Sequence, residues 1–327
     1  MSQGVIKRKR NRNDIFSKTM RKTIFIITIF CCINIYAQET VIFGKRGETE
    51  MKMDIYVGRQ EVKQDECIIY VFGGGFKSGS RCDSVTTDYC RKMQNLGFTT
   101  IAIDYRLGMK GFCSSDKIKF INEMEKSIHW AVEDLSMAVA YIVEYGRKWD
   151  IDPQKIITTG SSAGAITVLQ TDYYHARGSE YAKEIPADFR FAGVMAFAGA
   201  IFSREGLVDY TLHAPAPTMM WHGTKDNVVK YSKIQFGSLG FFGSSELVKR
   251  FEKAGYPYYL RRVVGAGHDV CEFGNDFTEE QLWFIEKYVR QRRQWQIDET
   301  YNDRNWRSSG RFSGKTSDLY NKKYHTK

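Results

Sequence analysis

The sequence predicts an α/β protein with a doubly wound, mostly parallel sheet of about eight strands and helices on both faces. Short apolar runs alternate with longer amphipathic stretches, and several runs are continuously apolar, as in strands that are buried on both faces. No repeat recurs along the chain, which argues against solenoids and propellers. The chain has 327 residues, of which 43% are hydrophobic, and this is enough for a large core.

Eight apolar runs are the expected strands. They are TVIFG near 40, KMDIYV near 52, CIIYVF at 67–72, FTTIAID at 98–104, KIITTG at 155–160, FAGVMAFAG at 191–199, PTMMWHG at 217–223 and YYLRRVV near 258. The expected helices lie at about 84–96, 117–147, 162–176, 244–254 and 277–292. The first two strands follow each other without a helix, which predicts an antiparallel hairpin at the edge of the sheet.

The formal charge of +10 is concentrated at the two ends of the chain. Residues 1–37 carry +7 and residues 291–327 carry +5, whereas residues 38–290 carry −2. A nucleic-acid surface would need its cations on the folded domain, so we do not expect a nucleic-acid partner. Residues 38–290 are the expected folded domain. Residues 291–327 lack apolar periodicity, which predicts a basic, poorly ordered tail.

The amino-terminal 37 residues have the pattern of a secretory leader. From Met20 the chain has two cations, an apolar stretch of about a dozen residues and then Ala37 before polar sequence. We expect cleavage after Ala37, a secreted or periplasmic protein, and no stable membrane insertion afterwards. An uncleaved anchor is the alternative, although the stretch is shorter than a spanning helix. Residues 1–19 are either a long basic extension of the leader or lie upstream of a true start at Met20.

Export would place the five remaining cysteines in an oxidising compartment. Cys82, Cys90 and Cys113 lie in segments rich in loops, where a disulfide among them is expected. Cys67 opens an apolar strand and is expected to be a buried free thiol, and Cys271 is the fifth. There is no C-x-x-C pair, so the cysteines do not indicate zinc or thioredoxin-like chemistry.

The stretch ITTGSSAGAIT at 157–167 predicts a nucleophile. A β-branched run ends there and helical spacing begins, which indicates a strand, a sharp turn and a helix. The five residues from Gly160 to Gly164 fit the pattern G-x-S-x-G, in which a strained turn holds the central Ser162 clear of the backbone. An ordinary loop rich in glycine and serine is the alternative.

A serine hydroxyl needs a base, and the base needs a carboxylate that orients it. His268 follows the last predicted strand and is flanked by glycine, at the edge where open α/β sheets bind ligands. Asp226 also follows a strand, which favours it over Asp172 and Asp209. Four further histidines lie downstream of Ser162, in less suitable positions: His175, His213, His222 and His325.

The stretch YVFGGGFKSGS at 70–80 places three glycines after a buried strand. Such a loop can direct backbone N–H groups toward a developing oxyanion. A flexible turn and a phosphate-binding loop are the alternatives. The second loses support because the chain has neither Gly-Lys-Ser/Thr nor G-x-G-x-x-G here.

Six stretches occur in the order and approximate spacing of α/β-hydrolase esterases with an HGGG-type oxyanion loop: FGGGF, AIDYRLG, AVEDL, TGSSAGA, HGTKDNVV and GAGHDV. Over about residues 40–290 the chain resembles secreted carboxylesterases of carbohydrate-degrading bacteria. The resemblance implies the α/β-hydrolase fold, with residues 38–290 as the catalytic domain. It also implies a carboxylesterase (a serine hydrolase) that needs neither a metal nor an organic cofactor.

The resemblance assigns roles position by position. It makes Ser162 the nucleophile, His268 the base and Asp226 the orienting acid. The oxyanion donors that it implies are the backbone N–H groups of Gly74, Gly75 and Ala163. Tyr105 and Arg106 match a DYR turn with a scaffold role. Phe72 departs from the pattern, because the esterases usually have a histidine that braces the loop at this position.

The expected reaction is hydrolysis of a carboxylic ester through an acyl-serine. No long apolar lid is evident, so short, acetyl-like acyl groups are favoured over lipids. Small-molecule esters and carbohydrate-linked esters are the expected substrates, the second only by resemblance. A serine peptidase of the same fold and a non-catalytic binding protein of the same fold are the alternatives.

Overall fold

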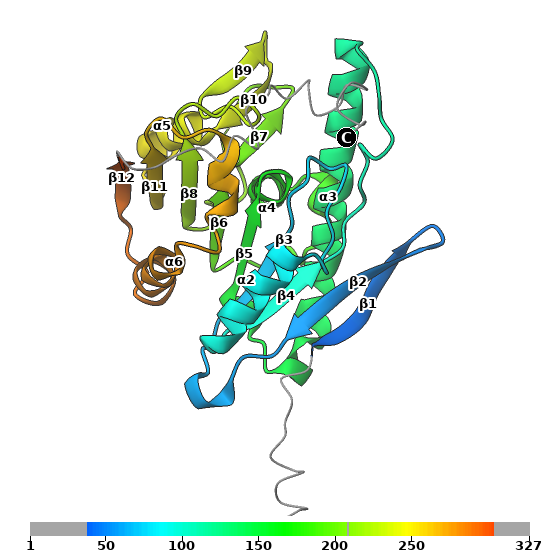
Figure 1. Cartoon of the computed structure of the whole chain (residues 1–327), viewed down its shortest axis with the longest axis vertical. Helices are drawn as coiled ribbons and strands as arrows, with labels where there is room; N and C mark the ends of the chain where they lie inside the picture. The colour runs from blue at the N-terminus through cyan, green and yellow to red at the C-terminus, as the bar shows by residue number, and fades with distance from the viewer. Residues whose placement is uncertain (1–37, 208, 304–327) are drawn as a thin grey trace, which may run out of the picture. The chain divides into compact units, whose positions relative to one another are not determined.

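The computed structural model describes residues 38–207 and 209–303, so the expected leader and the end of the tail lie outside the described residues. The main sheet has the strand order β1-β2-β4-β3-β5-β6-β8-β11-β12 (Figure 1). Its strands are β1 (Glu39–Arg46), β2 (Thr49–Tyr56), β3 (Cys67–Val71), β4 (Thr99–Ile103), β5 (Ile156–Ser161), β6 (Gly193–Phe197), β8 (Thr218–Gly223), β11 (Tyr258–Val263) and β12 (Gln296–Tyr301). The eight expected strands are confirmed, and β12 is an addition.

The sheet is mostly parallel. β1 and β2 form the predicted antiparallel hairpin at its edge, and β2 also runs antiparallel to β4. The remaining neighbours pair in parallel. β3, β6 and β8 are buried along their whole length, as continuously apolar runs predict. Parallel strands bring their carboxyl ends to one edge, and the loops that carry the candidate site begin there.

Helices cover both faces of the sheet. They are α2 (Ser84–Asn95), α3 (Lys117–Tyr145), α4 (Ala163–His175), α5 (Ser244–Ala254) and α6 (Thr278–Phe284), which continues into a π-helical turn at Ile285–Arg290. Tyr70 of β3 contacts Tyr89 of α2, with ring centroids 4.6 Å apart. Tyr70 pairs with Thr159 of β5, so both residues face the side of the sheet that α2 covers. Gly160, the residue after Thr159, faces the other side and lies against Gly164 of α4. α2 and α4 therefore lie on opposite faces, as predicted.

A second, three-stranded sheet was not expected from the sequence. Its order is β7-β10-β9, with β7 (Ala200–Ser203), β10 (Leu239–Gly243) and β9 (Lys233–Phe236), and both pairings are antiparallel. The apolar patterns of the sequence assigned no strand to these three segments.

The prediction of a poorly ordered tail after the last helix is wrong for β12. This strand pairs in parallel with β11. Arg261 of β11 forms an ion pair with Glu299 of β12, and Arg262 forms one with Asp298. β12 has charged side chains that pair with those of β11, and it lacks an apolar pattern. Hydrophobic periodicity therefore does not indicate this edge strand.

All five cysteines of the described residues are free thiols. The disulfide expected among Cys82, Cys90 and Cys113 is therefore not formed. Cys90 is buried on α2, and the thiol of Cys82 donates a hydrogen bond to Asp54. Cys67 is a buried free thiol, as predicted, and burial raises its pKa. Within the described ranges, no helix is both long and apolar enough to cross a membrane.

Candidate active site

Ser162 occupies the turn between β5 and α4 in a backbone conformation that few residues adopt. Its φ is 53° and its ψ is −115°, and its N–H donates to the carbonyl of Phe197 (2.9 Å). A Cβ on Gly160 would lie 2.5 Å from the backbone of Gly164, and a Cβ on Gly164 would lie 1.9 Å from the carbonyl oxygen of Val71. The turn therefore requires both glycines of the G-x-S-x-G pattern.

The structure brings Ser162, His268 and Asp226 into one hydrogen-bonded row. Oγ of Ser162 lies 2.7 Å from Nε2 of His268, and Nδ1 of the same ring lies 2.7 Å from Oδ2 of Asp226. Asp226 follows β8, and His268 opens a short 3-10 helix after β11. Since an ionised carboxylate only accepts, Nδ1 of His268 carries the hydrogen, and Nε2 accepts from the serine hydroxyl. The side chains of Asp226 and His268 are buried.

Four groups converge on the carboxylate of Asp226. Oδ1 accepts from the backbone N–H groups of Val228 (2.8 Å) and Val229 (2.9 Å). Oδ2 accepts from His268 and lies 3.4 Å from Nε2 of His222. Burial opposes ionisation of this carboxyl, but the hydrogen bonds from His222 and His268 outweigh it and hold the pKa of Asp226 well below its usual range. Asp226 is therefore ionised, and its carboxylate fixes the tautomer of His268 in which Nδ1 carries the hydrogen.

The other candidate acids and bases have partners elsewhere in the fold. These partners are the N–H of Ala216 for Asp172, Arg250 for Asp209, and backbone carbonyls for the histidines: that of Phe189 for His175, Ala214 for His213 and Val229 for His222. His325 lies outside the described residues. The approach of His222 to Asp226 was missed at the sequence level. The spacing of the two residues in HGTKDNVV, four apart, was the available signal.

The glycine loop after β3 passes beside the serine. A Cβ on Gly73 would lie 3.4 Å from Cβ of Ser162. Gly74 and Gly75 have φ values of 113° and 64°, which glycine adopts without strain. Gly75 and Ala163, the first residue of α4, line a cavity with Ser162, and Gly74 lines a second cavity on the other side of the serine. The residues expected to carry the oxyanion donors thus surround Ser162.

Phe72 stands where the esterases usually have histidine, and it braces the loop by packing. Its ring stacks on Tyr105 with centroids 4.4 Å apart, and it lies so close to Gly79 that a Cβ there would approach the ring to 2.6 Å. The hydroxyl of Tyr105 donates to the carbonyl of Phe72 (3.0 Å) and lies 3.5 Å from that of Gly73. Tyr105 therefore supports the loop from its backbone side.

Arg106 forms part of a partly buried ion cluster. Its guanidinium donates to Asp134 of α3, which is fully buried, and to Glu133. Arg46 of β1 bonds to the same Asp134. The stretches AIDYRLG and AVEDL are joined by this cluster, which ties the end of β4 to α3.

Comparisons with known proteins agree with this architecture. Residues 53–201 match the BD-FAE family. The structure of esterase 2 from Thermogutta terrifontis superposes with a TM-score of 0.55 and 21% sequence identity, over 78% of this chain and 94% of that one. The chain has the α/β-hydrolase fold.

The curated relatives of this α/β-hydrolase chain are lipases and esterases. A secreted triacylglycerol lipase of Gibberella zeae is 26% identical over 43% of this chain and 22% of its own length. Lipase 2 of Geotrichum candidum is 28% identical over 31% of this chain and 18% of its own length. Gut esterase 1 of Caenorhabditis elegans is 25% identical over 36% and 20%. The chain thus spans about a fifth of the length of the curated relatives that it matches.

Two cavities of the α/β-hydrolase domain meet at Ser162. The first has a volume of about 200 Å³ and is walled by apolar side chains from α3, α4 and the small sheet. The second has a volume of about 580 Å³ and is lined by His268, the glycine loop and the polar side chains of Lys77, Asp83 and Glu272. Among the described residues, no three His, Cys, Asp or Glu side chains are grouped as a metal site would require.

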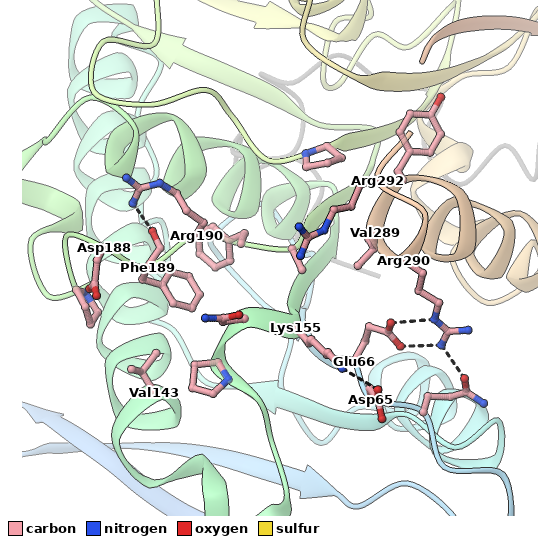
Figure 2. A pocket seen from close by; sticks show the side chains of 18 of the residues that line it. Asp65, Glu66, Val143, Lys155, Asp188, Phe189, Arg190, Val289, Arg290 and Arg292 are labelled. Atoms are coloured by element: carbon pink, nitrogen blue, oxygen red, sulfur yellow. Dashed lines mark hydrogen bonds and ion pairs between the residues drawn. The ribbon is translucent and has the colours of Figure 1, made fainter. Parts of the chain in front are cut away.

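A third cavity lies at the opposite edge of the sheet (Figure 2). It has a volume of about 950 Å³ and is lined by segments that enter β3, β5 and β6. Two of its cations are paired, Lys155 with Asp65 and Arg290 with Glu66. Ser162 does not line this cavity, so the candidate chemistry lies in the two smaller cavities.

Proposed function

We propose that the protein is a serine carboxylic-ester hydrolase. The observation that carries this proposal is the 2.7 Å separation of Ser162 Oγ from Nε2 of His268, whose Nδ1 is held by Asp226. His268 accepts the serine proton while Oγ bonds to the ester carbonyl carbon, and it then delivers that proton to the departing alcohol. Water deprotonated by His268 hydrolyses the acyl-serine, which releases the carboxylic acid and restores the hydroxyl.

The negative oxygen of each tetrahedral intermediate needs hydrogen-bond donors. Ala163 is the first residue of α4, where backbone N–H groups have no partner within the helix. We assign this N–H and those of Gly74 and Gly75 as the oxyanion donors. Such donors stabilise charge that develops only during the reaction, so they act on turnover more than on substrate binding.

The two cavities suit the two parts of an ester. Because His268 protonates the leaving alcohol, the alcohol lies in the cavity that His268 lines. The polar side chains there can bond to a hydroxyl-rich alcohol, which supports a carbohydrate-linked ester. The acyl group then enters the apolar cavity of about 200 Å³. Since an apolar cavity of ~150 Å³ holds benzene, acyl groups from acetyl to about one aromatic ring fit inside.

The structural neighbours support short acyl groups as substrates. Esterase 2 of Thermogutta terrifontis has been solved with propionate bound and with butyrate bound. The same protein has been solved phosphorylated by paraoxon. We therefore propose acetyl-like esters as substrates whose acyl groups occupy the part of the apolar cavity next to Ser162.

A panel of 4-nitrophenyl esters, together with acetylated and feruloylated xylan and peptide substrates, tests the proposal. Ser162→Ala should remain folded and lose about a thousandfold or more in kcat/KM. Ser161→Ala, which removes a hydroxyl from the neighbouring residue, should keep most of the activity. Cleavage of peptides in preference to esters would support the peptidase alternative. Failure to turn over any ester or to form a paraoxon adduct at Ser162 would support the non-catalytic alternative.

We also propose that the chain is exported, on the basis of its leader pattern. Expressed with its leader, the protein should be recovered outside the cytoplasm with Gln38 at or near its amino terminus. Mass spectrometry of the recovered chain measures this. Recovery of an intact segment 20–37 in the membrane fraction would indicate an anchored protein.

A further inference from the structure

The small sheet presents an apolar face to the cavity at Ser162. In the β9–β10 pairing, Phe236 lies opposite Leu239 and Ile234 lies opposite Phe241. Because side chains alternate along a strand and paired residues share a face, these four side chains lie on one face. All four line the apolar cavity together with Ser162. We call them the β9–β10 face.

The β9–β10 face continues from the interior to the surface. Phe202 of β7, which is 2% exposed, pairs with Phe241, and their ring centroids are 4.9 Å apart. The next residue across the sheet, Ile234, is 52% exposed, and Phe236 is 88% exposed. Lys233 alternates to the other face and pairs with Glu246 of α5. The exposed apolar side chains of β9 are therefore those directed to the cavity.

A second apolar wall stands across from this face. Phe120, Ile121 and Met124 near the amino-terminal end of α3 line the same cavity, and Ile166 of α4 lines it near Ser162. In Figure 1 the amino-terminal end of α3, β9 and β10 all lie in the upper part of the view, above α4. The cavity is thus a groove that begins at the serine and opens between α3 and the small sheet.

We propose that the β9–β10 face binds the distal part of an aliphatic acyl chain that extends beyond the interior part of the cavity at Ser162. This proposal rests on ester hydrolysis at Ser162 and deepens it. A contiguous exposed apolar patch on a soluble domain commonly marks a site of contact with a ligand or partner. Here the patch is continuous with the proposed acyl cavity. We therefore infer that the acyl chain of the substrate extends from the cavity along this patch. Ile234 and Phe236 are then residues that determine acyl-chain length.

The test compares kcat/KM on 4-nitrophenyl acetate, butyrate, octanoate and decanoate, below the concentrations at which the esters aggregate. The variant is the double substitution Ile234→Ser with Phe236→Ser. Leu212→Ser is the matched control, because Leu212 is 68% exposed and does not line the cavity. In the wild type, each methylene that contacts the face should raise kcat/KM by up to about fourfold, the effect of full burial.

The expected result is that the double variant lowers the octanoate-to-acetate ratio of kcat/KM by about tenfold or more, and that Leu212→Ser leaves this ratio unchanged. The proposal is overturned if the double variant keeps the wild-type ratio, or if the control lowers it equally. It is also overturned if the wild type hydrolyses acetate and butyrate but not octanoate, an outcome that leaves the proposed function intact. Absence of turnover on every ester would overturn both.

Discussion

Nε2 of His222 lies 3.4 Å from Oδ2 of Asp226, the same oxygen that accepts the hydrogen bond from His268. The ring of His222 also contacts the carbonyl of Val229 through Nε2 (2.9 Å) and the hydroxyl of Ser244 through Nδ1 (2.8 Å). A carbonyl only accepts, so Nε2 carries the hydrogen and Nδ1 accepts from the serine. This fully buried ring therefore joins the end of β8, the loop of Asp226 and the start of α5.

Replacement of His222 by leucine should lower both stability and turnover. The change leaves the carbonyl of Val229 and the hydroxyl of Ser244 without this partner in the interior, at a cost of about 1–3 kcal/mol for each. It also removes one of the four groups that position the carboxylate of Asp226. His222→Gln retains an N–H donor and should recover part of the turnover. Urea unfolding and kcat of the folded fraction measure the two effects. A leucine variant with wild-type kcat would show that Asp226 is positioned without His222.

Asp226→Asn should keep the fold and lower kcat by about four orders of magnitude, the loss typical of the orienting acid in such a triad. An amide does not stabilise the imidazolium that forms during attack, and its NH₂ group permits the wrong tautomer of His268. Stopped-flow or steady-state turnover of a 4-nitrophenyl ester measures the loss, with circular dichroism as the control for folding. A variant that keeps a tenth of the wild-type kcat would exclude Asp226 as the orienting acid.

The same carboxyl should make the folded protein sensitive to acid. Its pKa is depressed in the folded state, so the stability that it contributes is present above its unfolded pKa of about 3.9. That contribution is lost as the pH falls from about 5 toward the folded pKa, because the proton is bound more tightly in the unfolded chain. The free energy of unfolding of wild type should therefore fall more steeply below pH 5 than that of Asp226→Asn. Equal slopes in urea titrations at several acidic pH values would contradict the assignment.

The three residues of the row could be found from the sequence because each follows a strand. Ser162, Asp226 and His268 come after β5, β8 and β11, and parallel strands all end at the same edge of a sheet. The G-x-S-x-G pattern was sufficient to predict the turn at Ser162. The clash that requires Gly160 is local, with Gly164, whereas Gly164 itself is required by its approach to Val71 of β3. The fold class followed from the same alternation of buried strands and amphipathic helices.

What the sequence did not predict depends on strand pairings and on burial that the apolar pattern does not record. The β9–β10 face became visible only when the pairing of two very short strands was known. The side chains of β12 that pair with β11 are charged, so the strand has only a weak apolar pattern in the sequence. The disulfide expected from cysteine positions is not formed: Cys90 is buried on α2, and the thiol of Cys82 donates to Asp54.

Tyr105→Phe should lower kcat with little change in KM. The stacked ring remains against Phe72, but the carbonyl oxygens of Phe72 and Gly73 lose the hydroxyl that holds the glycine loop. Loss of one oxyanion donor costs about a hundredfold or more, so a loop that is only loosened should cost less, up to about tenfold. Steady-state kinetics gives the separate constants. A rise in KM with unchanged kcat would show that Tyr105 acts on substrate binding instead.

Asp172→Asn should stabilise the protein at alkaline pH and leave turnover nearly unchanged. Burial on α4 raises the pKa of Asp172 to about 7, although the N–H of Ala216 donates to it. The stability that Asp172 contributes through its raised pKa is fully present below the pKa of about 3.9 that the group has in the unfolded chain. It is lost as the pH rises through 7. Asparagine stays neutral and can still accept from Ala216. The difference in unfolding free energy between variant and wild type should therefore grow from pH 5 to pH 8, as urea titrations would measure.

Turnover of the same variant separates Asp172 from Asp226, two of the three candidate acids that follow Ser162 in the chain. Asp172 is bonded to the backbone of Ala216, whereas Asp226 is bonded to His268, so only the second substitution should abolish ester hydrolysis. A large loss of kcat in Asp172→Asn, with normal kcat in Asp226→Asn, would reverse the assignment. Parallel pH slopes of stability for Asp172→Asn and wild type would instead show that Asp172 is ionised in the folded protein near neutral pH, with a pKa close to its unfolded value.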